Sequence, residues 1–134
     1  MEDNKISPYI DYDLEQFLLS KGIEIDKPAK MYLNEIKRVP PLIPETEKQF
    51  LQNLDDKTTR TKLAESYLRF VVMIAKGYTD KDKLINLVQS GNSGLLKAVD
   101  SFNGNISFAE HAEKYIRQEI NSETENISFS LLAE

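Results

Sequence analysis

The chain has 134 residues, of which 40% are hydrophobic and 29% charged, and its formal net charge is -5. This length and composition predict one globular domain with a single hydrophobic core. The sequence has no cysteine, which excludes a disulfide framework and a thiolate site. Its apolar runs are short and its first residues are acidic, so we expect no membrane span, no secretory signal and a cytoplasmic location. The acidic balance is not that of a general nucleic-acid binder, so any DNA contact should be local or made beside a positively charged partner.

Residues 1–25 are predicted to form an N-terminal helical appendage. Ser7 and Pro8 have the order of an N-cap and a first-turn proline, which predicts a helix over residues 8–21 that ends at Gly22. Its apolar face consists of Leu14, Phe17 and Leu18. This pattern is compatible with a regulatory element and with a helix that fills the core, and we favour the second interpretation.

Two further helices are predicted by local signals. Asp26 and Pro28 open a helix that ends at Val39-Pro40-Pro41, and Pro44 opens the next one, with acidic residues in its first turn where the helix dipole favours them. The first of these helices has one apolar face, formed by Ala29, Tyr32, Leu33 and Ile36.

The longest helix is predicted over residues 57–78, with Asp55 and Asp56 as its cap. Its apolar stripe is so wide that it covers most of the circumference, which is typical of a central, buried helix. The stripe contains Leu63, Ala64, Tyr67, Leu68, Phe70, Val71, Val72, Ile74, Ala75 and Tyr78.

Two apolar helical patterns meet at residues 91–94, between Leu84 and Phe102. Polar residues recur among the apolar ones at fixed offsets, among them Gln89, Asn92 and Lys97. A helix buried on all sides does not need such residues, so this segment is predicted to face a partner.

The last helix is predicted to begin at a capping box formed by Ser107 and Glu110. Its inner stripe contains Ala109, Ala112, Ile116 and Ile120. Residues 122–134 are predicted to form a C-terminal tail, because Ile127, Phe129 and Leu131 alternate as in an extended or frayed segment. The predicted architecture is all-α.

The sequence carries no pattern that predicts catalysis. Its one histidine, His111, has no partner at a metal-ligand spacing, and the segment 91–94 lacks the glycine spacing of a nucleophile elbow. Phosphate-binding and dinucleotide-binding fingerprints do not occur either. We therefore expect no enzyme activity, no metal and no cofactor.

Four motifs follow one another in a fixed order: Met31-Tyr32-Leu33-Asn34-Glu35-Ile36, Leu63 to Lys76, Leu87-Val88-Gln89-Ser90-Gly91-Asn92-Ser93-Gly94-Leu95-Leu96 and Tyr115-Ile116-Arg117-Gln118. Together they resemble the bacterial RNA polymerase sigma factors of the sigma-70 family, in the segments called regions 1.2 and 2. The resemblance implies a compact helical domain like sigma region 2, with a short helical segment before it, over residues 26–121. No part of the chain matches regions 3 and 4.

The resemblance also implies a partner, the clamp coiled coil of the largest subunit of core RNA polymerase. Matched to the family motif, the polymerase-facing residues are Asn86, Gln89, Ser90, Asn92 and Leu96. The family usually has an aspartate at position 86 and a glutamate at position 90. Two anionic contacts with a basic coiled coil are therefore missing, and docking is expected to be weaker.

In the family, the following helix captures flipped bases of the minus-ten promoter element. The matching DNA-binding candidates are His111, Lys114, Tyr115, Arg117, Gln118 and Asn121. The family has an aromatic residue at position 111, tryptophans at 114 and 115, and threonines at 110 and 113. Captured bases need flat aromatic surfaces, and glutamates repel phosphate, so promoter DNA is expected to bind weakly or only together with a partner chain.

The leading hypothesis is a sigma-like transcription initiation protein with reduced promoter melting. It would be a degenerate sigma factor or one half of a divided one, with a separate chain as the second half. One alternative is a protein-interaction module that occupies the polymerase clamp or another transcription partner without binding DNA. A helical domain retained after loss of function is the third.

Overall fold

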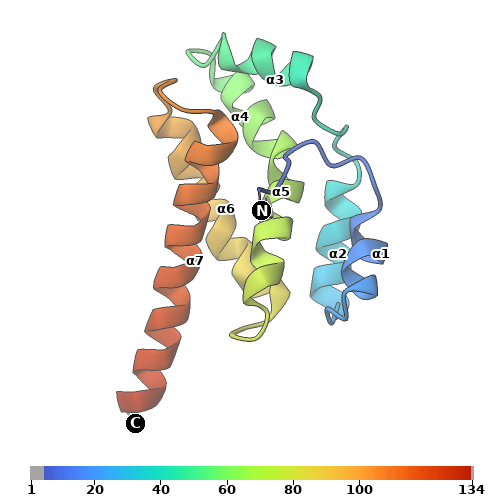
Figure 1. Ribbon diagram of the computed structural model, residues 1–134, viewed down its shortest axis with the longest axis vertical. Helices are drawn as coiled ribbons and strands as arrows, with labels where there is room; N and C mark the ends of the chain where they lie inside the picture. The colour runs from blue at the N-terminus through green and yellow to red at the C-terminus, as the bar shows by residue number, and fades with distance from the viewer. Residues whose placement is uncertain (1–4, 134) are drawn as a thin grey trace.

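The computed structural model describes the backbone of residues 5–133 and the side chains of residues 5–125, and every regular element in that range is helical. The predicted all-α architecture is therefore confirmed. The elements are α1 (Leu14–Ser20), α2 (Lys27–Ile36), α3 (Pro44–Leu51), α4 (Lys57–Ser66), α5 (Leu68–Ala75), the 3-10 turn η1 (Lys76–Tyr78), α6 (Leu84–Ser101) and α7 (Phe108–Ala133). Figure 1 shows α5 in the middle, α6 and α7 on one side of it, and α1 and α2 on the other.

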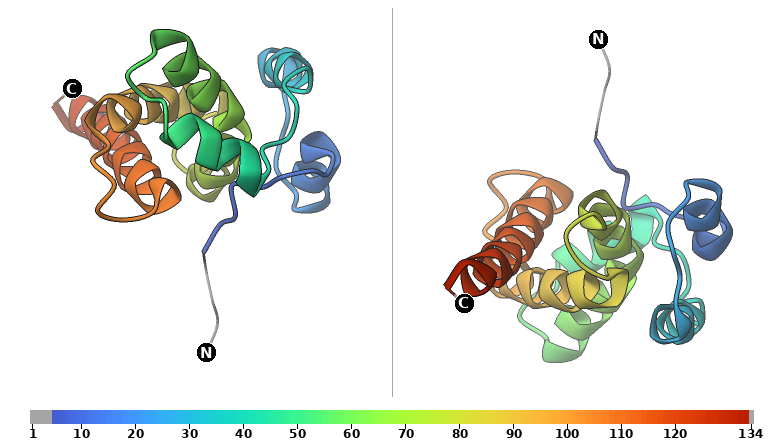
Figure 2. Two further views of the ribbon diagram at one scale, coloured as in Figure 1. Left: turned by 90° about the horizontal axis from the view of Figure 1, so that it is seen from above. Right: turned by 90° about the horizontal axis from the view of Figure 1, so that it is seen from below.

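The centre of the core is α5. Its six consecutive residues from Phe70 to Ala75 are all buried, because neighbouring helices cover it on both sides. Seen from above and below, α3 and α4 close the end of the bundle at which the loop between α6 and α7 also lies (Figure 2). The central position predicted for this segment is correct.

The single helix predicted over residues 57–78 is wrong, because the chain breaks at Tyr67 into α4, α5 and η1. Tyr67 leaves the helical region with φ -102° and ψ 5°. Its side chain is fully buried, with its ring edge-on to the rings of Phe70 and Phe108 at 5.3 and 4.9 Å. These contacts stabilise the break. The predicted cap is correct, since the Asp56 carboxylate accepts a hydrogen bond from the backbone N–H of Thr59.

A buried carboxylate joins three segments of the chain. Glu47, which the sequence placed in a helix first turn only for its charge, accepts hydrogen bonds from the hydroxyls of Tyr9 and Tyr67. The hydrogen bond to Glu47, together with burial, raises the pKa of Tyr9 to about 12. Burial and the same carboxylate raise the pKa of Tyr67 as well. The two hydrogen bonds tie the N-terminal segment to α3 and to the end of α4.

The helix predicted over residues 8–21 begins later than expected, at Leu14. Its N-cap is Asp13, whose carboxylate accepts from the backbone N–H of Gln16 at 3.1 Å. The preceding residues are not helical, because Tyr9 reaches Glu47 while Ile10 is buried in the core. Leu14 and Leu18 are buried in the same core, in agreement with the interpretation that this helix fills it.

The next two helices begin where the sequence places them. Asp26 accepts from the backbone N–H of Ala29 at 3.1 Å, with Pro28 in the first turn of α2. Pro44 is likewise the first residue of α3.

The two patterns expected to meet at residues 91–94 form one continuous helix, α6. The glycines serve close packing instead of a turn. A Cβ added to Gly94 would lie 2.8 Å from the Cα of Ile116 in α7 and would also meet the carbonyl oxygen of Tyr115. A Cβ on Gly91 would lie 2.6 Å from the side chain of Val71 in α5.

The C-terminal tail predicted as extended or frayed is helical, because α7 continues to Ala133. Its buried stripe continues past Ile120 to Thr124, which explains why the helix does not end near Asn121. The side chains of Ile127, Phe129 and Leu131, on which the prediction rested, lie outside the described residues. At the other end, Ser107 caps the helix by accepting from the backbone N–H of Glu110 at 3.2 Å.

We predict that Gly94→Ala lowers the free energy of unfolding by about 1–3 kcal/mol, because the new methyl group must displace the backbone of α7. The matched control is Gly77→Ala, where no atom lies within 4 Å of the added Cβ. That control should be neutral or stabilising by up to about 1 kcal/mol. Chemical denaturation of both variants measures the difference, and equal midpoints would contradict the packing role of Gly94.

We predict that Ser107→Ala lowers the free energy of unfolding by about 0.5–2 kcal/mol, because the backbone N–H of Glu110 loses its acceptor. Ser107→Asp should preserve stability, since a carboxylate caps equally well and also suits the helix dipole. Urea denaturation of the two variants tests the cap. A destabilised aspartate variant would show that the hydroxyl acts in another way.

Candidate functional site

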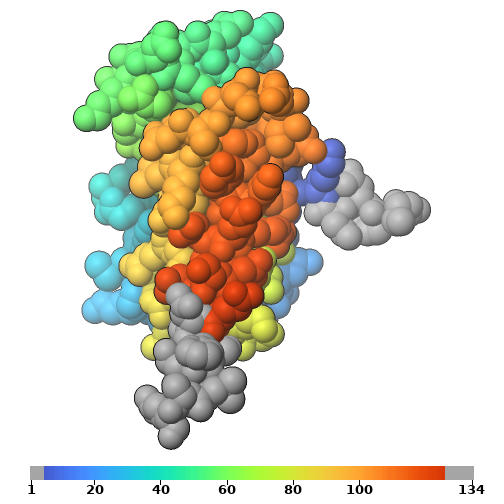
Figure 3. Space-filling view, turned by 90° about the vertical axis from the view of Figure 1, so that its left-hand side faces the viewer, coloured from blue at the N-terminus to red at the C-terminus, as the bar shows by residue number. Residues whose placement is uncertain are grey.

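The outer faces of α6 and α7 form one continuous surface, which Figure 3 shows face on. Three of the predicted polymerase-facing residues lie on it in the open: Asn86 and Gln89 are exposed, and Leu96 has an exposed fraction of 58%. Leu96 is one of several large apolar side chains exposed in the described residues. It lies about two turns from Gln89 and almost three turns from Asn86, and together these residues make this face of α6 suited to a protein partner.

Asn92, by contrast, points toward α2 and is half-buried. Its side-chain N–H donates to the hydroxyl of Tyr32 at 3.0 Å, and its Oδ1 is buried without a hydrogen-bond partner. Burial raises the pKa of Tyr32, although the hydrogen bond from Asn92 acts in the opposite direction. Asn92 is therefore first of all a contact between α2 and α6.

Ser90 lies on the other edge of α6, where it is half-buried and faces α7. It lines a groove of about 300 Å³ together with Asn86 and Gln89. Further along the same edge, Lys97 of α6 and Glu119 of α7 form an ion pair with an N–O distance of 2.7 Å. The two helices thus share polar contacts along their common surface.

On α7, the predicted DNA-binding residues separate into three groups. Lys114, Gln118 and Asn121 are exposed on the outer face of the helix. His111 and Tyr115 lie on the edge toward α6, and Arg117 lies on the opposite edge, near η1. The structure therefore brings most of these candidates to one side but separates Arg117 from them.

The side chain of His111 contacts the C-terminal end of α6. Its Nε2 lies 3.1 Å from the carbonyl oxygen of Ala98 and 3.1 Å from the hydroxyl of Ser101, both in the last turn of that helix. The imidazole also packs against two aromatic rings, with centroid distances of 5.4 Å to Phe102 and 4.9 Å to Tyr115. A residue with these contacts already has a structural role, so it offers only part of its ring to a ligand.

Arg117 is held by its own neighbours. Its Nε donates to the Glu113 carboxylate at 2.8 Å, and a second nitrogen donates to the hydroxyl of Tyr78 at 3.1 Å. Partial burial alone would lower the pKa of Arg117, but the hydrogen bonds to Tyr78 and Glu113 raise it above its usual value. The guanidinium thus stays charged, with part of its charge neutralised by Glu113.

The charge of α7 is acidic between Phe108 and Glu125. This segment contains five acids (Glu110, Glu113, Glu119, Glu123 and Glu125) and two bases (Lys114 and Arg117). Because Arg117 is paired with Glu113, the surface repels a phosphate backbone more than it attracts one.

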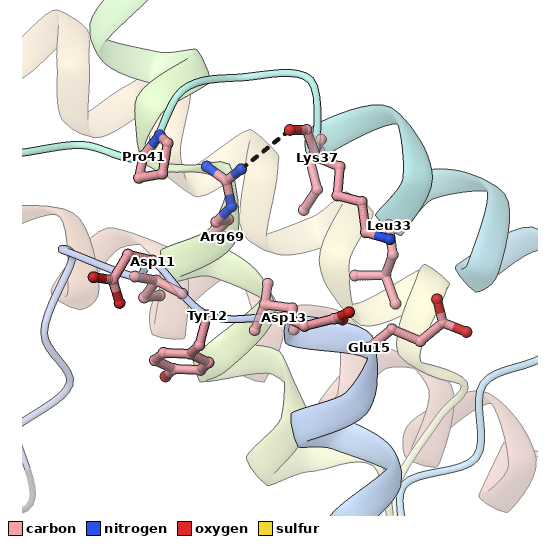
Figure 4. A pocket seen from close by; sticks show the side chains of 11 residues that line it. Asp11, Tyr12, Asp13, Glu15, Leu33, Lys37, Pro41 and Arg69 are labelled. Atoms are coloured by element: carbon pink, nitrogen blue, oxygen red, sulfur yellow. Dashed lines mark hydrogen bonds between the residues drawn. The ribbon is translucent and has the colours of Figure 1, made fainter.

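A second concave feature lies where α1, α2 and α5 meet, a pocket of about 80 Å³ shown in Figure 4. Arg69 donates to the carbonyl oxygens of Val39 at 2.7 Å and Lys37 at 3.5 Å, and burial lowers its pKa. The carboxylates of Asp11 and Glu15 point away from this guanidinium. Arg69 therefore holds the chain just after α2, and the pocket offers no free recognition group at its centre.

Within the described residues, no three or more histidine, cysteine, aspartate or glutamate side chains gather as metal ligands. Among the helices of the same part of the chain, none is both long and apolar enough to cross a bilayer.

Comparison with known proteins finds curated relatives of this chain by sequence. No family model matches the chain. Three curated relatives are each named RNA polymerase sigma factor SigA. The protein from Clostridium acetobutylicum is 45% identical over 107 residues, which cover 76% of this chain and 28% of the relative. The protein from a Bacillus species is 39% identical over 125 residues, which cover 89% and 33%. The protein from Listeria monocytogenes is 39% identical over 114 residues, which cover 81% and 30%.

The chain is therefore homologous to bacterial RNA polymerase sigma factors of the sigma-70 family over most of its own length, and the resemblance found in the sequence is confirmed. It spans a third or less of the length of these curated relatives.

We predict that Glu113→Gln strengthens binding to a single-stranded minus-ten oligonucleotide, because it releases the charge of Arg117. The slope of log affinity against log salt concentration should steepen by about 0.7, the value for one additional phosphate contact on single-stranded DNA. Glu125→Gln removes the same charge from an exposed position of α7 and is the matched control. Fluorescence anisotropy at several salt concentrations measures both, and equal slopes would contradict the release of Arg117.

Proposed function

We propose that this chain is a sigma-factor-like protein that docks on core RNA polymerase and has a reduced ability to read and melt a minus-ten promoter element. The proposed function is binding to core RNA polymerase in the cytoplasm, without catalysis by this chain. The sequence identity of 39–45% to proteins named RNA polymerase sigma factors supports the polymerase as the partner. The observation that carries the docking site is the exposed face of α6.

That face has the composition of an interface. Leu96 is exposed to 58%, and Asn86 and Gln89, which lie nearer the start of the same helix, are exposed uncharged amides. An exposed leucine is stabilised when a partner covers it, and amides supply hydrogen bonds without the desolvation cost of a charge. We propose that these three residues, with Ser90, meet the clamp coiled coil. Asn92 would contribute indirectly, by holding α2 against α6.

The weak DNA function rests on α7. Unstacking a base must be offset by new stacking, at about 1–3 kcal/mol per base. Tyr115 is the one aromatic residue at the two positions where the family has tryptophans, and its ring already packs against His111. The acidic charge of the helix adds repulsion. We therefore propose that efficient promoter opening requires another protein surface, such as a separate chain that completes a divided sigma factor.

The second candidate function is a module that occupies the polymerase clamp, or a related partner, without touching DNA. The pairing of Arg117 with Glu113 favours it, because this arrangement removes a cation from the DNA-facing set. The two candidates differ in one measurement. A sigma-like protein adds promoter-specific opening to core polymerase when the missing surface is supplied, whereas a blocking module lowers opening by a competing sigma factor.

We predict that Leu96→Asp weakens binding to core RNA polymerase at least tenfold, because it puts a charge in place of the apolar centre of the interface. The matched control is Met31→Asp on α2, since Met31 is exposed to 59%, almost the same fraction as Leu96. This control should bind like the unmodified chain. Biolayer interferometry with immobilised core polymerase measures all three affinities.

Equal losses in both variants would show that the effect is a general one of surface charge. No loss in either would remove α6 from the docking site. Saturable binding by the unmodified chain is the baseline for both conclusions.

A further inference from the structure

The groove between α6 and α7 contains two carboxylates that are not among the predicted docking residues. Its lining is Asp82, Asn86, Leu87, Gln89, Ser90, Glu123 and Thr124, around a volume of about 300 Å³. Asp82 precedes α6, and Glu123 comes from the part of α7 beyond Asn121 that the sequence did not predict to be helical. Both acids enter one groove with three of the predicted docking residues.

The two acids stand close to the positions where charge is missing. Asp82 lies one helical turn before Asn86, and its Oδ1 accepts from the side-chain N–H of Asn86 at 3.1 Å and from the backbone N–H of Lys83 at 2.7 Å. Asn86 therefore orients the carboxylate of Asp82 at the groove. Glu123 lines the same groove from α7, on the side of α6 that carries Ser90.

We propose that this groove receives an arginine side chain of the docking partner, and that Asp82 and Glu123 supply the two anionic contacts absent at positions 86 and 90. The proposal rests on the proposed function, and it names the chemistry by which the same site recognises its partner. The charge has moved to neighbouring positions, so the surface keeps its preference for a basic partner.

The lining of the groove supports arginine as the occupant. It contains two acids, two amides, two hydroxyls and no basic side chain. A guanidinium presents five N–H donors in a plane, so it can reach acceptors on two helices at once, whereas a lysine ammonium is a compact point charge. Asp82 is half-buried and Glu123 is exposed, and a partner that covers the groove would shield their charge pairs from salt.

The proposal can be tested by removing the charge at position 82 or 123 and then adding a charge at position 86 or 90. Asp82→Asn and Glu123→Gln should each weaken binding to core polymerase about three- to tenfold, as expected for a partly desolvated ion pair. Adding Asn86→Asp to the first variant and Ser90→Glu to the second should restore affinity to within about twofold. Glu125→Gln, an exposed acid of α7 outside the groove lining, is the matched control and should bind like the unmodified chain.

The partner group is tested by salt and by chemistry. The Asp82→Asn, Glu123→Gln double variant should lose less affinity than the unmodified chain between 50 mM and 300 mM salt. Blocking the arginines of core polymerase with a dicarbonyl reagent should weaken polymerase binding by the unmodified chain more than binding by the double variant. Thermal unfolding of each variant shows whether its fold is retained.

Three outcomes are distinguishable. Loss of affinity in the single variants with recovery in the restored pairs supports the relocation of charge. Unchanged affinity in the Asp82 and Glu123 variants, together with a loss in Leu96→Asp, overturns the groove but leaves polymerase docking intact. Absence of saturable binding by the unmodified, folded chain overturns docking and the groove together.

Discussion

The close approach of α7 to α6 at Gly94 is the constraint on which the rest of the surface depends. With no side chain at this position, the backbone of α7 at Tyr115 and Ile116 lies directly against α6, and Gly91 allows the same for the side chain of Val71 in α5. Protein interiors are packed as densely as organic crystals, so one additional methyl group here would separate the helices. Their outer faces would then no longer form one surface, and no groove would run between them.

This packing has direct consequences for the two candidate interfaces. His111 and Tyr115 are carried against the last turns of α6, where the imidazole meets the carbonyl of Ala98 and the tyrosine carbonyl faces Gly94. The side chains that the family uses to capture bases thus have structural contacts in this chain. On α6, the same geometry leaves Leu96 exposed. Packing therefore occupies two of the candidate DNA-binding residues, whereas the candidate docking residue Leu96 stays exposed.

Local signals in the sequence predicted what local interactions determine. The caps at Asp26 and Ser107 were correct, because each depends on residues three positions apart. The other half of the predicted capping box differs, since the Glu110 carboxylate accepts from the hydroxyl of Ser107 and not from its backbone N–H. The break at Tyr67 was missed because Tyr67 bonds to Glu47, 20 residues earlier in the chain. Asn92 was predicted to face the polymerase and turns toward Tyr32, which is 60 residues away. The family motif predicted which residues form the candidate surface, but the packing of the helices determines which of those side chains are exposed.

Under the proposed function, the two departures from the family pattern share one electrostatic explanation. The candidate docking residues and the candidate DNA-binding residues lie on adjoining parts of one surface, and an exposed field extends about 10 Å at ordinary ionic strength. Glu113 and Glu119 of α7 are paired with Arg117 and Lys97, so these pairs contribute little net charge. The remaining acids of α7, among them Glu123 in the groove, would attract a basic protein helix and repel a phosphate backbone. Under the proposed function, the same negative charge would therefore favour docking and weaken DNA binding.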